Sequence, residues 1–355
     1  MNKLYEATVH DLSTNFEYLL INLNTMNVLV TGANGLLGHH IVNELLDRND
    51  QVSVIVRSRR KLFFDTTRIT IFEGKFHDAE LLIQALTGID AIIHVAAVTA
   101  TNLLEYHDYH EVNVVATQLL IDKAKEKGIK RFVYVSTSNT IGNGSIENPS
   151  NESAAFAEPF NKSFYARSKF EAEKLIRKLS EDKEMHAVVI NPTFLIGKYD
   201  TKPSSGKILQ IGYGRKRVFT TSGGKNFVSA HSVAVACVNA MLMGVSGENY
   251  LAAGHNLSFV EFYMLRSKVT ALNQRITVVP SSVLKFFGWI GNILRRVGVK
   301  TDLSLSNFNQ LLIQEYYEGT KAREQLALPE TNLEESIREA LEWFVENGYL
   351  KAKRT

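Results

Sequence analysis

The 355-residue chain carries 40 Lys and Arg against 37 Asp and Glu, with 45% hydrophobic and 22% charged residues. This balance is typical of an ordinary globular protein with an ample core, and it gives no general case for binding nucleic acid or membranes. Cys237 is the only cysteine, which excludes an internal disulfide and a cysteine metal cluster. We therefore expect no metal site and a reducing, cytoplasmic compartment.

Residues 1–25 precede the first pattern that indicates regular structure. Their one apolar run, Tyr18-Leu-Leu-Ile, is too short for a signal peptide or a membrane span. We expect these residues to form a dispensable N-terminal extension, with the folded region beginning at Met26.

Residues 26–40 combine a short β-branched run, glycines at 32, 35 and 38, and a helical apolar pattern. Gly32 permits a tight turn, Gly35 lets a pyrophosphate approach the backbone, and Gly38 lets the helix lie close to the strand. An ordinary strand–helix turn can carry the same glycines, so the spacing alone leaves both interpretations open. If the site is real, cofactor contacts are expected from Gly32, Asn34, Gly35, Leu36 and Leu37, at the positive end of the helix.

Beyond this turn, strand and helix patterns alternate, which predicts an α/β fold with a Rossmann-like, doubly wound parallel sheet. Strands are expected at 51–56, 69–72, 91–95, 131–136 and 187–191, and helices at 78–86, 109–127 and 164–179. The predicted nucleotide-binding domain spans 26–197, and 225–250 return to it. A smaller C-terminal substrate-binding region comprises 198–224 and 251–355.

Positive charge follows the second expected strand. NAD-selective sites commonly place an acid there to bind the ribose 2′-hydroxyl, whereas this chain has Arg57 and no acid before Asp65. A solvated basic loop is the alternative interpretation for Arg59, Arg60 and Lys61. The position of Arg57 itself favours a contact with the 2′-phosphate of a dinucleotide. NADP(H) is therefore the predicted cofactor, with NAD(H) as the alternative.

Tyr165 and Lys169 lie four residues apart on one face of an expected helix, behind the strand that ends near Ser138. A phenol needs about 4 kcal/mol of help to exchange a proton near neutrality, and a nearby ammonium can supply that order of energy. Tyr165 is thus the predicted general acid–base, Lys169 the group that lowers its pKa, and Ser138 the hydroxyl that orients the reacting oxygen. Tyr165 and Lys169 are also expected to contact the cofactor, Lys169 at the nicotinamide ribose. Tyr317 and Lys321 share this spacing but lack a preceding strand, so we interpret them as structural.

At this point the chain resembles the extended, atypical branch of the short-chain dehydrogenase/reductases, the epimerase/dehydratase-like group. The resemblance covers Met26 to about Tyr349 and rests on six segments: Thr31–Gly38, His94–Ala97, Asn113–Thr117, Val135–Ser138, Tyr165–Lys169 and Asn191–Gly197. It implies a catalytic set of Ser138, Tyr165 and Lys169 supported by Asn113. It further implies that Ala96, Ala97, Pro192 and Thr193 line the dinucleotide, and it is compatible with a homodimer.

The C-terminal third is expected to hold the substrate. Its basic, glycine-rich segment 198–224 fits either an anionic substrate or a solvated loop. Lys225 and Asn226 stand where nucleotide-sugar members of the family tend to carry Arg and Asp, so the pattern is closer to the dihydroflavonol reductase and 3β-hydroxysteroid dehydrogenase-like members. The apolar run 278–294 is read as core or pocket packing, with weak membrane-surface contact as the alternative. A capping box is expected at Thr331–Glu334.

The sequence thus predicts an NADP(H)-dependent oxidoreductase that interconverts a carbonyl and an alcohol on a small organic substrate. It predicts neither a nucleic-acid partner nor an integral membrane segment. The first alternative is a nucleotide-sugar epimerase or dehydratase with tightly bound NAD(P). A second is a regulator that senses the cofactor without catalysis.

Overall fold

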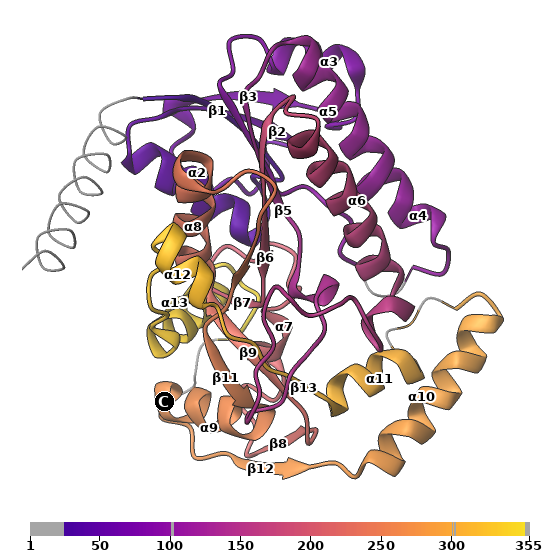
Figure 1. The fold of residues 1–355 in the computed structure, drawn as a ribbon. Coiled ribbons are helices and arrows are strands. Elements are labelled where there is room, and N and C mark those ends of the chain that lie inside the picture. The colour runs from indigo at the N-terminus through magenta and orange to yellow at the C-terminus, as the bar shows by residue number, and fades with distance from the viewer. Residues whose placement is uncertain (1–24, 101–102, 300, 302, 352–355) are drawn as a thin grey trace, which may run out of the picture.

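The computed structural model describes residues 25–100, 103–299, 301 and 303–351, so the extension expected at the N-terminus lies almost wholly outside the described residues. A seven-stranded sheet forms the centre of the molecule (Figure 1). Every neighbouring pair in it is parallel, in the order β10-β6-β5-β4-β1-β2-β3. Its strands are β1 (Asn27–Thr31), β2 (Gln51–Val56), β3 (Ile69–Glu73), β4 (Ala91–His94), β5 (Arg131–Val135), β6 (His186–Pro192) and β10 (Asn249–Ala252). The predicted doubly wound α/β fold is confirmed.

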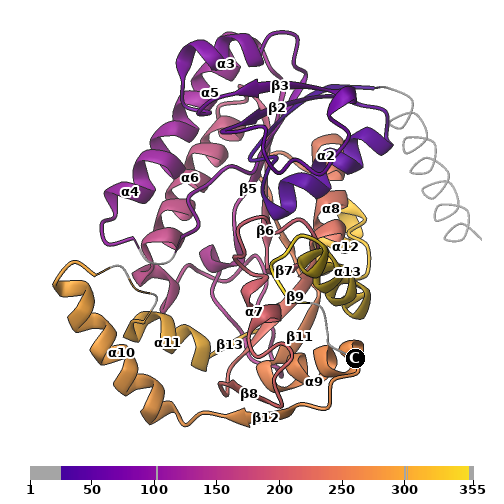
Figure 2. The same ribbon diagram turned by 180° about the vertical axis from the view of Figure 1, so that it is seen from behind.

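Helices cover both faces of this sheet, as the two opposite views show (Figures 1 and 2). One layer holds α2 (Leu36–Asp47), α8 (Ala230–Met243) and α12 (Thr320–Leu326), and the other holds α3 (Ala79–Ala85), α5 (Ala116–Glu126) and α6 (Phe164–Glu181). Because both faces are buried, the central strands are continuous apolar runs, as in β4, whose four residues are all buried. Cys237 packs inside α8, fully buried.

A smaller sheet lies beyond the carboxyl ends of the large one. It joins β7 (Phe194–Ile196), β9 (Gly224–Ser229), β11 (His255–Ser258) and β13 (Gln314–Glu315), and a separate pair joins β8 (Arg217–Thr220) to β12 (Arg275–Val278). Residues 225–229 therefore belong to the small sheet, and the expectation that they return to the large one is wrong. Only α8 and β10 make that return, because β9 finds partners in β7 and β11.

Helices α7 (Lys207–Gln210), α9 (Phe259–Thr270) and α13 (Leu333–Glu346) pack with the small sheet, whereas α10 (Ser281–Arg296) and α11 (Leu305–Leu312) form an outer corner (Figures 1 and 2). The capping box predicted at Thr331–Glu334 is wrong by one residue. Asn332 caps α13 by accepting from the Glu335 N–H at 3.1 Å. Thr331 instead accepts from the Ser229 N–H at 3.2 Å, which ties β9 to the approach of α13.

Candidate active site

The glycine turn between β1 and α2 lies at the carboxyl end of the large sheet, where β1 has β4 on one side and β2 on the other. Gly32 adopts φ +74°, and a Cβ there would lie 2.7 Å from the Ala96 nitrogen. A Cβ on Gly38 would collide with the Gly32 carbonyl oxygen. Within the described chain no side chain caps the N-terminus of α2, so its backbone N–H groups face the turn. The turn therefore has the shape of a cradle for a pyrophosphate.

A chain of hydrogen bonds links this turn to the neighbouring helix. The Ala96 N–H donates to the Thr31 hydroxyl at 3.2 Å, and that hydroxyl lies 2.6 Å from Nδ1 of His94. On its other side, His94 Nε2 lies 3.0 Å from the Thr117 hydroxyl, which donates to the Asn113 carbonyl at 2.9 Å. Each hydroxyl has one proton, so Thr31 donates to Nδ1, and His94 carries its proton on Nε2. Burial lowers the pKa of His94 to about 3, so the ring stays neutral.

Asn113 joins the loop after β4 to helix α6. Its amide oxygen accepts from the Val98 N–H at 2.7 Å, and its amide nitrogen donates to the Val98 carbonyl at 3.1 Å and to the Ser168 hydroxyl at 2.9 Å. The helix expected over 109–127 is divided here into α4 (His107–His110), a π-helical turn (Glu111–Val115) and α5. Such a turn inside a helix often accompanies a functional site. Asn113 thus fixes the segment that carries Ser168 and Lys169.

Tyr165 lies in the first turn of α6 and faces the carboxyl end of β5. Burial raises the pKa of its phenol to about 12, while a hydrogen bond from the Thr137 side chain works in the opposite direction. Thr137 also accepts from the Asn139 N–H at 3.3 Å, so its hydroxyl is fixed in place. The structure therefore gives Tyr165 a hydroxyl partner one residue before the predicted Ser138.

Ser138 begins a short 3-10 turn, and its carbonyl accepts from the Tyr317 hydroxyl at 3.4 Å. Tyr317 precedes α12, so it shares no helix with Lys321. Three hydroxyl residues, Ser136, Thr137 and Ser138, follow β5 in succession. Because β5 ends at Val135, the alternation of side chains along a strand does not indicate which of the three faces the site.

Lys169 is 2% exposed and donates from Nζ to the Val135 carbonyl at 2.7 Å, with Nζ 4.1 Å from the centre of the Tyr134 ring. Burial lowers the pKa of Lys169 to about 7, and the charge of Glu173 partly counteracts this. Burial is the largest cause acting on the pKa of Tyr165, and the Lys169 ammonium donates to the Val135 carbonyl, so the effect of Lys169 on that pKa stays a prediction.

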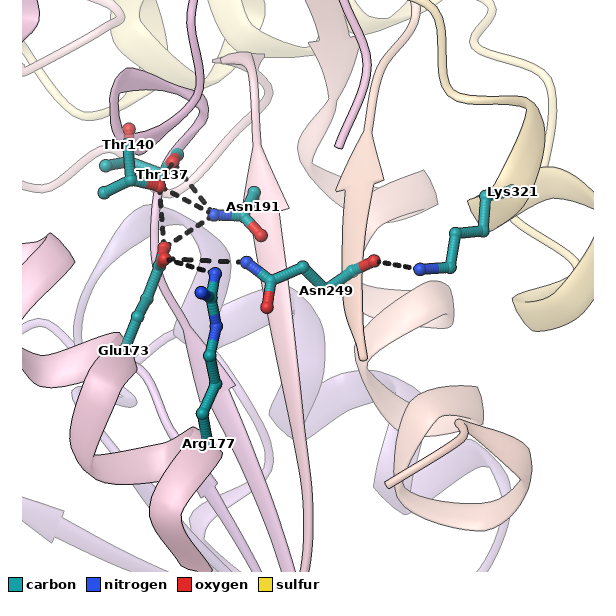
Figure 3. Close-up of polar contacts among 7 residues, drawn as sticks. All are labelled: Thr137, Thr140, Glu173, Arg177, Asn191, Asn249 and Lys321. Atoms are coloured by element: carbon teal, nitrogen blue, oxygen red, sulfur yellow. Dashed lines mark hydrogen bonds and ion pairs between the residues drawn. The ribbon is translucent and has the colours of Figure 1, made fainter. Parts of the chain in front are cut away.

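Glu173, one turn further along α6, is a functional candidate that the sequence did not indicate. Its side chain is 1% exposed, and Oε1 accepts from the Thr140 hydroxyl and the Asn191 amide, both at 2.7 Å (Figure 3). The Thr137 carbonyl lies 2.8 Å from the Thr140 hydroxyl, so it shares the single hydroxyl proton with Glu173, and it accepts from the Asn191 amide at 3.1 Å. The other carboxylate oxygen lies 3.6 Å from Arg177 and 3.5 Å from the Asn249 amide. This network connects α6, β6 and the turn that holds Thr137.

Arg57 is exposed and directly follows β2, the strand that pairs with β1 just before the glycine turn. A segment distant in sequence reaches the same place, because the Thr201 hydroxyl donates to the Asn34 carbonyl at 3.1 Å. The charge of Arg57 is the main cause that lowers the pKa of Lys202, followed by burial and by the charge of Lys61. Arg57 and Lys61 therefore both lie near Lys202, which belongs to the C-terminal region.

The position of this basic cluster, defined as Arg57, Lys61 and Lys202, is fixed by Tyr349. Lys61 donates to the Tyr349 hydroxyl at 2.9 Å, which donates to the Thr201 carbonyl at 2.8 Å. None of the three cations pairs with a carboxylate among the described residues, whereas Arg59 pairs with Glu73 at 3.5 Å. Like charges gathered without an acid are suited to an anion.

Pro192 ends β6, and Thr193 follows it, beside the small sheet. The Thr193 hydroxyl donates to Asn226 Oδ1 at 2.7 Å, and the Asn226 amide nitrogen donates to Asn256 at 2.7 Å and to the Gly254 carbonyl at 3.1 Å. Lys225 is paired with Glu315 at 2.5 Å. The side chains of Lys225 and Asn226 thus both bind other residues of the same chain.

Comparison with known proteins agrees with this architecture. Residues 28–253 match the model of the NAD dependent epimerase/dehydratase family. The chain is 26% identical over 332 residues to sterol demethylase protein B of Methylococcus capsulatus, covering 92% of this chain and all of that one. It is 30% identical over 179 residues to a 3-beta-hydroxysteroid dehydrogenase of Mycolicibacterium neoaurum, covering 49% and 48% of the two chains.

Among solved structures, a dTDP-glucose 4,6-dehydratase of Streptomyces venezuelae with NAD bound has the same fold, with a TM-score of 0.72. The two chains are 21% identical, and the match covers 92% of this chain and 99% of that one. The family model spans most of the chain, including the glycine turn, Thr137, Tyr165 and Lys169. The protein is a member of the NAD-dependent epimerase/dehydratase family, the extended branch of the short-chain dehydrogenase/reductases.

Proposed function

We propose that this protein is an NADP(H)-dependent oxidoreductase that interconverts a carbonyl and an alcohol on a small organic substrate. The observation that carries the proposal is the position of the buried Tyr165 phenol beside the Thr137 side chain, with Lys169 on the next turn of the same helix at the carboxyl ends of the strands. Ligands of doubly wound sheets bind at this edge. Thr137 takes the role that the sequence assigned to Ser138.

The proton chemistry follows from this arrangement. The bound nicotinamide would supply the hydride to the carbonyl carbon. Tyr165, with a pKa of about 12, keeps its proton near neutrality and can give it to the oxygen, which becomes far more basic as the carbonyl is reduced. Thr137 donates to the phenol oxygen and so stabilises the phenolate that remains. In the oxidative direction the phenolate acts as the base, so oxidation should gain from a higher pH.

The glycine turn and the basic cluster suit NADP(H). The turn leaves room for a pyrophosphate where a side chain at Gly32 would collide with the Ala96 backbone. Arg57, Lys61 and Lys202 offer three cations to a 2′-phosphate without an acid that would repel it. An uncharged 2′-hydroxyl would leave these charges uncompensated, which favours the phosphorylated cofactor.

The small sheet favours a carbonyl substrate over a nucleotide sugar. Lys225 is neutralised by Glu315, and Asn226 is consumed by backbone and side-chain contacts, so neither is available to a substrate diphosphate. Relatives named as a sterol demethylase and a 3-beta-hydroxysteroid dehydrogenase support the same choice. We infer an apolar carbonyl compound as the substrate class.

The test is the consumption of NADPH by the purified protein with a panel of ketones and aldehydes that includes steroid and flavonoid ketones. We expect turnover that Tyr165→Phe reduces by at least a hundredfold while cofactor affinity is kept, because only the transferable proton is lost. Tyr213→Phe is the matched control. Sugar-nucleotide conversion without net redox change, by protein that retains its cofactor, would instead identify an epimerase or dehydratase.

The cofactor assignment is tested by binding. Arg57→Asp and Lys202→Ala should each weaken NADPH at least tenfold and leave NADH nearly unchanged, since each removes a charge that only the 2′-phosphate uses. Lys216→Ala, an exposed lysine outside the basic cluster, serves as the control. Equal losses for both cofactors would contradict the phosphate assignment.

A further inference from the structure

Helix α10 presents large apolar side chains to solvent. The exposed fractions are 58% for Phe286, 47% for Phe287, 58% for Trp289 and 41% for Ile293. Together with Val283 these residues are called the α10 apolar face. Positions 283, 286, 287 and 293 fall on one side of the helix, with Trp289 at its margin. A single exposed apolar residue needs no explanation, but a contiguous group with three aromatic rings does.

The interior contact of α10 is made by a different side of the helix. A Cβ on Gly291 would collide with the Leu303 carbonyl, and one on Gly288 would lie 3.0 Å from the Leu305 backbone. These glycines let α10 pack directly on the start of α11, with Leu284 buried beside them. The core packing that the sequence predicted for this run is therefore made by the side of α10 that carries the glycines and Leu284. The α10 apolar face lies on the other side, in contact with solvent.

The location of α10 agrees with a role at a surface. In both views the α10–α11 pair forms a corner of the molecule away from the large sheet and its helices (Figures 1 and 2). Arg295 donates to the Leu103 carbonyl at 3.0 Å, which attaches this corner to the loop after β4. The described helices include none that is long and apolar enough to cross a membrane.

Lys285 and Arg296 border the apolar face on the side of Trp289. Residues 262–301 contain no Asp or Glu, in a chain whose total charge is nearly balanced. Among the described residues no carboxylate pairs with the cations of α10, which are Lys285, Arg295 and Arg296. An apolar face bordered by cations is complementary to a layer that offers acyl chains beneath phosphates.

We propose that α10 lies flat on an anionic lipid surface, with the α10 apolar face in the boundary between headgroups and acyl chains and Lys285 and Arg296 against lipid phosphates. A second copy of the chain is a poorer occupant. A two-fold interface would place the face against itself and bring the cations of both copies together. Docking on lipid keeps every cation near an anion. The proposal is independent of the reaction that the protein catalyses.

The chain carries its own probe for this contact. Its two tryptophans are Trp289, 58% exposed, and Trp343, 6% exposed, so a change in the fluorescence of a solvated indole reports α10. The full chain is mixed with vesicles of phosphatidylcholine alone or with added phosphatidylglycerol. We expect a blue shift and co-sedimentation only with the anionic vesicles, both weakened by salt. The Trp289→Phe variant should still sediment but lose the blue shift.

The variants separate the apolar and ionic contributions. Phe286→Ser combined with Phe287→Ser should reduce vesicle binding at least tenfold, and so should Lys285→Glu combined with Arg296→Glu. Ile83→Ser, on the exposed side of α3, should have no effect. Absence of wild-type binding to anionic vesicles would overturn the proposal. So would a wild-type dimer, found by light scattering, that the phenylalanine variant converts to a monomer while vesicle binding is unchanged.

Discussion

Replacing Glu173 by Gln should move the pH dependence of the proposed reduction. Glu173 is buried, and its charge favours the protonated form of Lys169, whose pKa burial lowers to about 7. A glutamine keeps an oxygen for Thr140 and Asn191 but removes that charge. The ammonium of Lys169 would then lose its proton at a lower pH.

The structure sets the size of the effect. Loss of an adjacent opposite charge shifts a pKa by about one unit or more, and the lower end applies because Arg177 already shares the carboxylate. Burial places the folded-state pKa of Lys169 below its unfolded value, so protonation is complete only below about pH 7. We expect the reductive kcat/KM of the wild type to fall as pH rises through about 7. In Glu173→Gln that fall should occur about one unit lower.

The measurement is NADPH oxidation with a ketone substrate over a pH series, together with thermal unfolding. Placing an amide N–H₂ beside Arg177 and Asn249 should also cost about 1–3 kcal/mol of stability. Glu181→Gln, the same change at an exposed position of α6, should alter neither quantity. A lower rate with an unmoved pH profile would show that Glu173 only supports the fold, and it would refute the electrostatic argument.

Three further changes test neighbouring parts of the site. Thr137→Val should reduce kcat at least tenfold with a small change in KM, and Ser138→Ala should have a much weaker effect; the reverse order would restore the serine assignment. Lys169→Met should abolish activity yet raise the free energy of unfolding by a few kcal/mol at pH 7 or below. The reason is that between about pH 7 and 10.5 Lys169 of the wild type is protonated in the unfolded state but not in the folded state, so the wild type gains stability over this range. Thermal unfolding should therefore show the advantage of the variant shrinking as pH rises, and a constant advantage would contradict the argument. Gly32→Ala should weaken binding of NADP(H) and destabilise the protein by about 1–3 kcal/mol, since the added methyl group meets Ala96 at a positive φ; unchanged cofactor affinity would exclude the turn as the binding site.

The sequence predicted the large sheet well because its signals are local. The bounds of β2 agree with the prediction residue for residue, and Asp78 caps α3 by accepting from two backbone N–H groups. Gly32 adopts a positive φ, and a side chain at Gly38 would collide with the Gly32 carbonyl oxygen. Turn, cap and buried strand are all decided within a few neighbouring residues.

The parts that were missed depend on contacts between distant segments. Lys202 joins Arg57 only because the loop after β7 folds onto the glycine turn. Glu173 becomes an acceptor for Asn191 only when α6 packs on β6. Ser138 was predicted where we propose Thr137, because three hydroxyl residues follow one another and the turn that orients them has no sequence signature. Such contacts depend on how distant segments pack together, and the spacing of residues along the chain does not indicate that packing.

The buried polar groups near the turn also identify which residue can respond to pH. His94 is fixed between two hydroxyls as a neutral ring, with a pKa of about 3, so it holds Thr31 and the Asn113 segment in register at every pH at which the protein is used. Lys169, whose charge also acts to lower the pKa of His94, has a pKa of about 7. Since only one of these buried bases titrates near neutrality, a pH-dependent rate there reports the charge of Lys169. The hydrogen-bond chain through His94 keeps its geometry while the charge of Lys169 changes with pH.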